Sequence, residues 1–176
     1  MGRWSGWPAR MTDVQRECCH CTDEIVRVGH SLIKEQAIRE GALFAGESSG
    51  HFFLNMGDKG CYEVPMIVTL KLLQELSESS KSFADYVKPL KRYFHSGEIN
   101  SKVRNVQEVI DAVAKKYNDG TQNKLDGVSV EYDDYWFNVR GSNTEPLIRL
   151  NLEAKSQAVM EQKRDEVLAL IKSFNA

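Results

Sequence analysis

The sequence predicts an α/β unit followed by an α+β unit, and two patterns of strands and helices carry this prediction. In the first half, short apolar runs at residues 24–28 and 42–46 flank a helical pattern at 32–40, the order of a strand, a helix and a strand. In the second half, strand patterns at 98–105, 128–132, 135–139 and 147–154 alternate with helical patterns at 106–117 and 157–174. This β-α-β-β-β-α order is typical of an antiparallel sheet with helices on one face.

The remaining elements of the first half follow from local signals. Gly41 is placed to cap the first helix at its C-terminus, and residues 55–60 read as a turn. Apolar residues at helical spacing then predict a second helix that ends within residues 77–82: Ile67, Leu70, Leu73 and Leu76. A shorter helix follows at 83–90 and stops around Pro89.

In the second half, apolar side chains define the faces that pack. In the strand at 147–154, Ile148, Leu150 and Leu152 share one face, whereas Arg149, Asn151 and Glu153 point to the other. The apolar faces of the two helices consist of Val106, Val109, Ile110 and Val113 in the first and of Val159, Val167, Leu168, Leu170 and Ile171 in the second. These faces predict a core between the sheet and its helices.

Four segments result from these patterns. Residues 1–22 lack periodicity, and we expect a disordered tail there. Residues 23–90 form the first unit, 91–96 a linker, and 97–176 the second unit. We expect the second unit to fold independently, and the first to expose apolar surface and a sheet edge and so to be marginally stable.

Charge and composition exclude several classes of function. The formal net charge of the 176 residues is −2, which gives no reason to expect nucleic acid or an anionic membrane as partner. No apolar run has the length of a membrane span, and the start lacks the apolar segment of a secretory signal, so we expect a cytoplasmic protein. Neighbouring residues cannot surround one tetrahedral zinc ion, so we expect reduced thiols in the cluster Cys18, Cys19, His20 and Cys21.

Residues 140–146, Arg-Gly-Ser-Asn-Thr-Glu-Pro, join two predicted strands and carry donors for an oxyanion. Arg140 can form two parallel hydrogen bonds with an oxyanion, and the hydroxyls, the amide and the main-chain N–H groups add further donors. The set suits a phosphate held without a metal. The alternative is an ordinary polar turn with a solvated arginine.

Three blocks in this order resemble the α-D-phosphohexomutase family, the phosphomannomutase/phosphoglucomutase enzymes. The last is residues 140–154, which resembles the family's phosphate-binding loop and its following strand. Gly46-Glu47-Ser48-Ser49-Gly50-His51 resembles the sugar-binding loop, and residues 28–34 resemble the loop that recognises the orientation of the sugar. A family-like linker at 93–100 lies between the second block and the last. The resemblance covers about residues 24 to 175 and implies part of the third domain and the whole fourth, TATA-box-binding-protein-like domain.

The resemblance also implies roles for individual residues. Glu47 and Ser49 would bind sugar hydroxyls, and His51 would be a further contact and a candidate for proton transfer. Gly29 and His30 would recognise the sugar, with Lys34 on the following helix; a solvated lysine is the alternative for Lys34. The implied phosphate ligands are Arg140, Ser142, Asn143, Thr144 and Arg149.

Residues 46–50 also satisfy the Gly-x-Ser-x-Gly pattern of a hydrolase, with Ser48 at the centre. A nucleophile at the turn of a hydrolase must be followed at once by a helix. Here Phe52, Phe53 and Leu54 follow instead and favour extended chain. The hydrolase interpretation therefore fails.

The resemblance implies a mutase cycle in which a phosphoserine exchanges its phosphoryl group with a hexose phosphate, assisted by Mg²⁺. The chain contains neither the Ser-His-Asn-Pro segment of the phosphoserine nor the Asp-Gly-Asp-x-Asp loop that holds the metal. We therefore expect the C-terminal part of a phosphomannomutase/phosphoglucomutase that binds mannose or glucose phosphates and is inactive alone. A non-catalytic sugar-phosphate binding module is the alternative.

Overall fold

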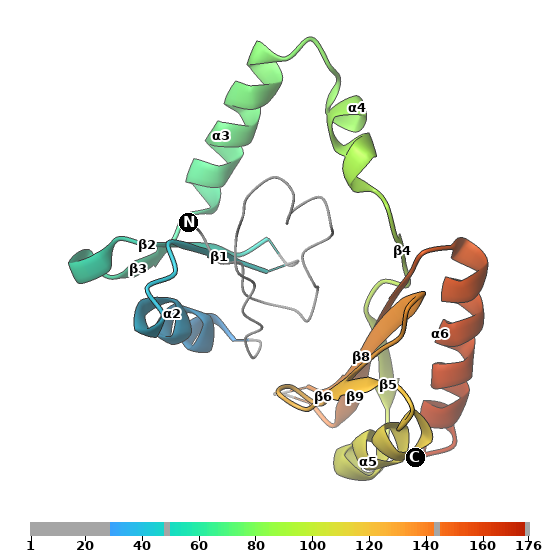
Figure 1. The fold of residues 1–176 in the computed structure, drawn as a ribbon. Helices are drawn as coiled ribbons and strands as arrows, with labels where there is room; N and C mark the ends of the chain where they lie inside the picture. Colours follow the sequence, from blue (N-terminus) through green and yellow to red (C-terminus); the bar gives the residue numbers. More distant parts are fainter. Residues whose placement is uncertain (1–28, 48–49, 143–144, 175–176) are drawn as a thin grey trace. The chain divides into compact units, whose positions relative to one another are not determined.

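A computed structural model describes residues 29–47, 50–142 and 145–174, and the chain divides into two compact units, residues 1–90 and 91–176 (Figure 1). The predicted tail, the predicted strand at 24–28, and Ser49, Asn143 and Thr144 lie outside the described residues. No helix in the described part of the chain is long and apolar enough to cross a membrane.

The first unit contains a three-stranded antiparallel sheet in the order β1-β2-β3. Its strands are β1 (Phe44–Gly46), β2 (Phe52–Asn55) and β3 (Cys61–Glu63). The predicted strands β1 and β2 form a hairpin, which makes residues 47–51 its connecting loop. Strand β3 was not predicted, because its three residues follow the turn at η1 (Gly57–Lys59) too closely to show an alternating pattern.

Helix α2 (His30–Arg39) packs on this sheet. It begins two residues before the predicted start at Leu32, so His30 belongs to its first turn. Its predicted end is confirmed: Gly41, at φ 62°, donates from its N–H to the Ile38 carbonyl at 3.2 Å, and Ala42 donates to the Ala37 carbonyl at 2.9 Å. The small core of the unit contains Ile33, Ala37, Ala42, Ala45, Phe53 and Cys61.

Helix α3 (Pro65–Glu78) begins with a proline in its first turn, and α4 (Phe83–Val87) and η2 (Lys88–Leu90) follow it, as the sequence predicts. None of the α3 residues, all of which the structure describes, is buried. Leu70 and Leu73 are 58% and 53% exposed. The first unit therefore exposes apolar surface, as expected.

The second unit is built on a six-stranded antiparallel sheet in the order β4-β9-β8-β7-β6, with β5 also paired to β9. Its strands are β4 (Phe94–His95), β5 (Ile99–Lys102), β6 (Thr121–Asn123), β7 (Val128–Glu131), β8 (Tyr135–Gly141) and β9 (Leu147–Ala154). Strands β4 and β6 were not predicted. Phe94 and His95 lie in the predicted linker, but they pair with the end of β9.

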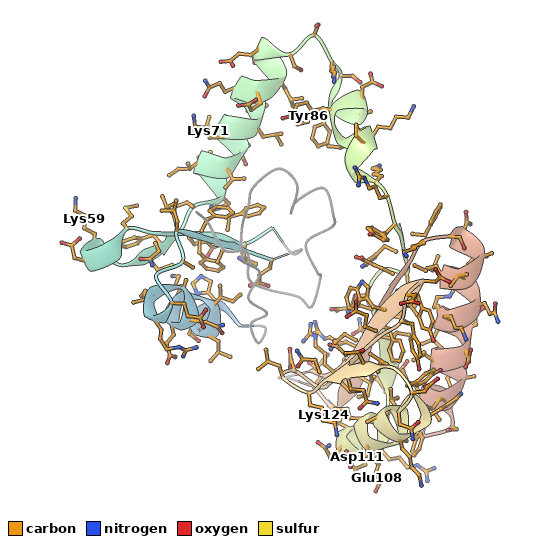
Figure 2. The ribbon with its side chains drawn as sticks, in the orientation of Figure 1. Lys59, Lys71, Tyr86, Glu108, Asp111 and Lys124 are labelled. Carbon is orange, nitrogen blue, oxygen red and sulfur yellow. The ribbon has the colours of Figure 1, made fainter. Side chains whose placement is uncertain are left out.

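Helices α5 (Val106–Lys116) and α6 (Gln157–Lys172) are capped by the side chains of Asn105 and Ser156, which accept hydrogen bonds from main-chain N–H groups of the first turn. Glu108 and Asp111 lie on the solvent side of α5 (Figure 2). The opposite side of α5 packs on the sheet through Val109 and Val113. The fully buried core between the sheet and both helices also includes Phe137, Ile148, Leu150, Leu152, Val167 and Ile171. The predicted faces of β9 and α5 are thus confirmed.

The other side of this sheet is polar, and we call it the polar face. It carries Trp136, Asn138 and Arg140 of β8 and, directly opposite on β9, Glu153, Asn151 and Arg149. Among the described residues, the buried polar or charged ones all belong to this face: Asn138, Arg140 and Asn151. The sequence pattern correctly predicts that the Asn151 side chain points away from the helices, but it does not indicate that Asn151 is fully buried.

Candidate functional site

In the first unit, two of the predicted sugar-binding histidines meet at one carboxylate. His30 Nε2 lies 2.7 Å from Glu63 Oε2, and His51 Nδ1 lies 2.7 Å from Glu63 Oε1. The three residues come from the start of α2, the end of the hairpin loop and the end of β3. We call them the histidine-glutamate cluster.

The cluster assigns the protons of both rings. Hydrogen bonds from His51 and His30 lower the pKa of Glu63, so its carboxylate is ionised at neutral pH and only accepts hydrogen bonds. His51 therefore donates from Nδ1 and His30 from Nε2. The hydrogen bond to Glu63 also raises the pKa of His51 above its usual value, and Nε2 is the nitrogen of His51 that remains to gain or lose a proton.

The side chains of His30 and Lys34 pack on the ring of Phe53. The His30 ring meets the edge of Phe53 at a centroid distance of 5.0 Å and lies 6.3 Å from the His51 ring. Lys34 Nζ lies 5.8 Å from the Phe53 ring centroid. Because Phe53 is fully buried, it gives both His30 and Lys34 a fixed surface to lie on.

The hairpin loop brings Glu47 toward His51. The Glu47 N–H donates to the His51 carbonyl at 2.9 Å, and the Gly50 N–H donates to the Glu47 carbonyl at 3.0 Å. The charge of Glu47 also contributes to the raised pKa of His51. Of the predicted sugar-binding residues, Glu47 thus contacts His51, and His51 meets His30 at Glu63; Gly29 immediately precedes α2.

In the second unit, the two predicted phosphate-binding arginines are cross-strand neighbours. Arg140 and Arg149 face each other in the β8–β9 ladder, and their side chains are 7% and 30% exposed. Glu98 lies between them: its Oε2 accepts from Arg140 Nη2 at 3.4 Å and its Oε1 from Arg149 Nη1 at 3.0 Å. We call Arg140 and Arg149 the arginine pair.

The loop after Arg140 is closed at its base. The Ser142 N–H donates to the Leu147 carbonyl at 2.9 Å, and Gly141 pairs with Ile148. Ser142 thus begins the loop at a fixed distance from the arginine pair.

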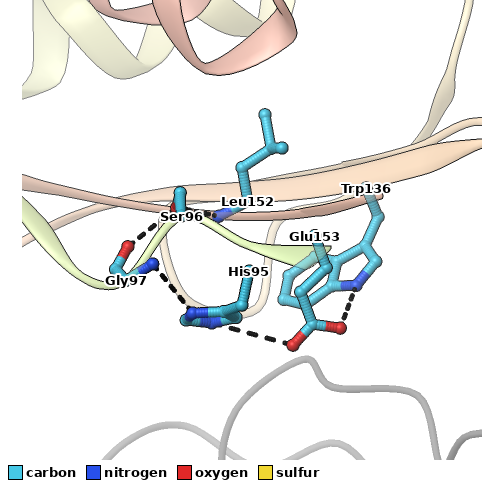
Figure 3. Close-up of polar contacts among 6 residues, drawn as sticks. All are labelled: His95, Ser96, Gly97, Trp136, Leu152 and Glu153. Carbon is cyan, nitrogen blue, oxygen red and sulfur yellow. Dashed lines mark hydrogen bonds and ion pairs between the residues drawn. The ribbon is translucent and has the colours of Figure 1, made fainter. Parts of the chain in front are cut away.

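A second polar network lies on the same face and fastens the chain where it enters the second unit (Figure 3). Glu153 accepts from the Trp136 indole N–H at 3.2 Å, and its other oxygen lies 3.7 Å from His95 Nε2. His95 Nδ1 accepts from the Gly97 N–H at 2.8 Å, while Ser96 bonds to the main chain of Leu152. The segment before Glu98 is therefore held to β9.

Sequence reasoning missed Glu63 and Glu98, which contact the predicted ligand-binding side chains. Glu63 is 12 and 33 residues from its histidines, and Glu98 is 42 and 51 residues from its arginines. Of the two, only Glu98 could have been found from the sequence, because it lies in the family-like linker at 93–100.

The described residues do not fit a Mg²⁺ site. No group of three or more His, Cys, Asp or Glu side chains in this part of the chain has an arrangement that could hold a metal ion, the histidine-glutamate cluster included.

The sequence matches two family descriptions. Residues 15–93 match "Phosphoglucomutase/phosphomannomutase, alpha/beta/alpha domain III", and residues 98–170 match "Phosphoglucomutase/phosphomannomutase, C-terminal domain". The first match includes residues 15–22, to which sequence reasoning assigned no counterpart.

Individual relatives agree with these matches. A phosphomannomutase of Methanocaldococcus jannaschii is 38% identical over 150 residues, which are 85% of this chain and 33% of that protein. A phosphoglucomutase/phosphomannomutase family protein of Burkholderia thailandensis superposes with a TM-score of 0.79 at 25% identity, covering 98% of this chain and 37% of that one. N-acetylphosphoglucosamine mutase of Aspergillus fumigatus, in complex with GlcNAc-6P and magnesium, shares the fold with a TM-score of 0.64 at 11% identity, covering 99% of this chain and 39% of that one. The chain spans about a third of the length of the curated relatives it matches.

Proposed function

We propose a binding function for this chain, which belongs to the phosphohexomutase family and corresponds to its domains III and IV. It recognises the hexose and the non-transferred phosphate of a hexose phosphate. The reaction it serves is the interconversion of hexose 1-phosphate and 6-phosphate through a bisphosphate. The ligands are phosphates of mannose or glucose, and the protein works in the cytoplasm.

The single observation that carries this proposal is the arginine pair. Arg140 and Arg149 stand side by side on two paired strands, and Arg140 is almost fully buried. Two neighbouring guanidinium groups on a rigid sheet suit a doubly charged phosphate, which accepts from both forks at once. Ser142, Asn143 and Thr144 add neutral donors from the loop that follows Arg140.

The first unit supplies hexose recognition in this proposal. The Glu47 carboxylate accepts from sugar hydroxyls, and the Ser49 hydroxyl donates to them or accepts from them. His51 presents Nε2 as the atom that accepts or returns a hydroxyl proton, because Glu63 holds Nδ1. Gly29 and His30 complete the hexose contacts at the start of α2.

The phosphoryl transfer itself belongs to other parts of the family's machinery. This sequence carries no Ser-His-Asn-Pro or Asp-Gly-Asp-x-Asp segment, so it offers neither the phosphoserine nor the acidic metal loop. We therefore propose that the chain alone binds but does not turn over hexose phosphates. The same observation favours the second candidate, a non-catalytic sugar-phosphate binding module.

A titration of glucose 1-phosphate and mannose 1-phosphate into the chain, followed by amide NMR, tests the proposal. We expect shifts at residues 140–149 that disappear in Arg140→Ala. Arg164→Ala is a matched control, because Arg164 lies on α6, on the helix-covered side of the sheet, and contacts Asp165 instead of Glu98. Absence of shifts at millimolar ligand, or equal shifts in Arg140→Ala, would refute phosphate binding. A coupled mutase assay tests the inactivity that both candidates share, since measurable turnover by the purified chain would refute it.

A further inference from the structure

Two positive charges face each other on the polar face. Arg140 and Arg149 are direct cross-strand partners, and like charges in this position repel each other. Arg140 is only 7% exposed, so water screens its charge poorly. The sheet therefore needs a negative charge at this place before any ligand arrives.

Glu98 supplies that negative charge. Its two carboxylate oxygens contact one arginine each, at 3.4 Å from Arg140 Nη2 and 3.0 Å from Arg149 Nη1. A guanidinium N–H that donates to Glu98 is not available to a phosphate oxygen in the same direction. The carboxylate thus occupies the anion position of the arginine pair.

The hold of Glu98 on the arginine pair is weak enough to be broken. Its side chain is 31% exposed, and its contact with Arg140 is longer than a typical charge-assisted hydrogen bond of about 2.8 Å. The arginine pair carries two charges and Glu98 neutralises one, so a doubly charged phosphate matches the pair better. A singly charged anion gains nothing over the carboxylate already there.

We propose that Glu98 is an internal counter-ion of the phosphate site, which an incoming phosphate dianion displaces and which excludes singly charged anions. Glu98 is then a specificity-determining residue. The inference rests on the proposed phosphate binding by Arg140 and Arg149.

The test compares the 176-residue chain with its Glu98→Gln variant. Inorganic phosphate and acetate are titrated separately into each, and the amide and arginine side-chain signals of Arg140 and Arg149 are followed by NMR. We expect Glu98→Gln to bind phosphate about fivefold more tightly, the factor expected when a partly exposed ion pair no longer competes. We also expect acetate to shift the arginine signals in Glu98→Gln only, because its carboxylate takes the vacated position.

Two further variants keep the test decisive. Glu153→Gln removes the same charge from the same face, but Glu153 contacts Trp136 and His95 instead of the arginines, so it should leave both titrations unchanged. Glu98→Asp keeps the charge but is too short to reach both arginines, so its phosphate affinity should lie between those of the chain and Glu98→Gln. Matching amide spectra in regions remote from the arginines confirm that each variant is folded.

The outcomes separate this inference from the proposed function. Phosphate binding that is unchanged or weaker in Glu98→Gln would overturn the counter-ion role while leaving phosphate binding in place. Acetate shifts of equal size in both proteins would overturn the exclusion of singly charged anions. If neither protein binds phosphate, both the proposed function and this inference fail.

Discussion

His51 Nδ1 and Glu63 Oε1 lie 2.7 Å apart, and this contact orients the imidazole so that Nε2 is its outer nitrogen. The same carboxylate also accepts from His30, so one residue of β3 orients two rings from other elements. A ring held in this way loses little freedom when a sugar hydroxyl arrives. The histidine-glutamate cluster therefore holds both rings in place before any ligand that the proposed function requires is bound.

Glu63→Gln should lower the pKa of His51. The hydrogen bond between His51 and Glu63 and the negative charge of Glu63 both raise this pKa, and the hydrogen bond has the larger effect. An NMR titration of the His51 ring protons measures the change. Glu75→Gln, an exposed charge on α3, is the control and should leave the titration curve in place. An unchanged His51 pKa in Glu63→Gln would show that Glu63 does not hold the ring.

The same pair predicts how stability depends on pH. The pKa of His51 is raised above 6.5, so its contribution is complete below pH 6.5 and is lost as pH rises through the folded-state value. The pKa of Glu63 is lowered below 4.5, so its contribution is complete above pH 4.5 and is lost as pH falls through the folded-state value. The difference in thermal stability between the chain and Glu63→Gln should therefore be greatest between pH 4.5 and 6.5. A pH-independent difference, measured from the thermal loss of the Phe53 amide signal, would contradict this.

Asn138 and Asn151 are buried and directly opposite on β8 and β9, but leucine at each should have different effects. Asn138 Nδ2 donates to the Asp126 carbonyl at 2.9 Å and to Ser129 Oγ at 3.0 Å, whereas the Asn151 amide has no hydrogen-bond partner in the described part of the chain. Asn138→Leu should cost about 2 kcal/mol, about 1 for each lost hydrogen bond. Asn151→Leu should cost less or stabilise the unit, because it removes an unpaired buried amide. Urea unfolding followed at β8 and β9 amides measures both, and equal losses would contradict the assignment.

Gly97 and Gly127 adopt nearly the same conformation, with φ of 71° and 68°, but differ in the space around them. A Cβ at Gly97 would meet nothing within 4 Å, whereas one at Gly127 would lie 2.2 Å from the Val139 carbonyl oxygen. Gly97→Ala should therefore cost about 1 kcal/mol, the strain of the left-handed conformation alone. Gly127→Ala should cost at least about 3 kcal/mol, because the main chain of β8 must move. Chemical denaturation of both variants decides the matter; similar costs would mean that β8 yields easily.

The sequence predicted the elements that have long, regular patterns. The alternation of Ile148, Leu150 and Leu152 identified β9, and the spacing of Val109 and Val113 identified the buried side of α5. Strands β3, β4 and β6 have three residues or fewer, which is too short for alternation to be visible. Their pairing depends on the longer strands beside them.

The candidate site was predictable only where its residues lie together in the sequence. Arg140 and Ser142 share one loop signal, and Glu47 and His51 share another. Glu63 and Glu98 reach their partners only through strand pairing and the turns between strands, which no local pattern encodes. The burial of Asn151 was also hidden, because the strand pattern indicates a direction for each side chain but not what covers it.

The β8–β9 ladder has a consequence for how the proposed phosphate site can change. Arg140 and Arg149 belong to the paired strands, whereas Ser142 lies beyond the last residue of β8, Gly141. Substitutions, insertions and deletions between Gly141 and Leu147 change the donors available there, while the two arginines keep the positions that the sheet gives them. Redesign of the loop for other phosphorylated ligands can therefore begin from an unchanged pair of charges.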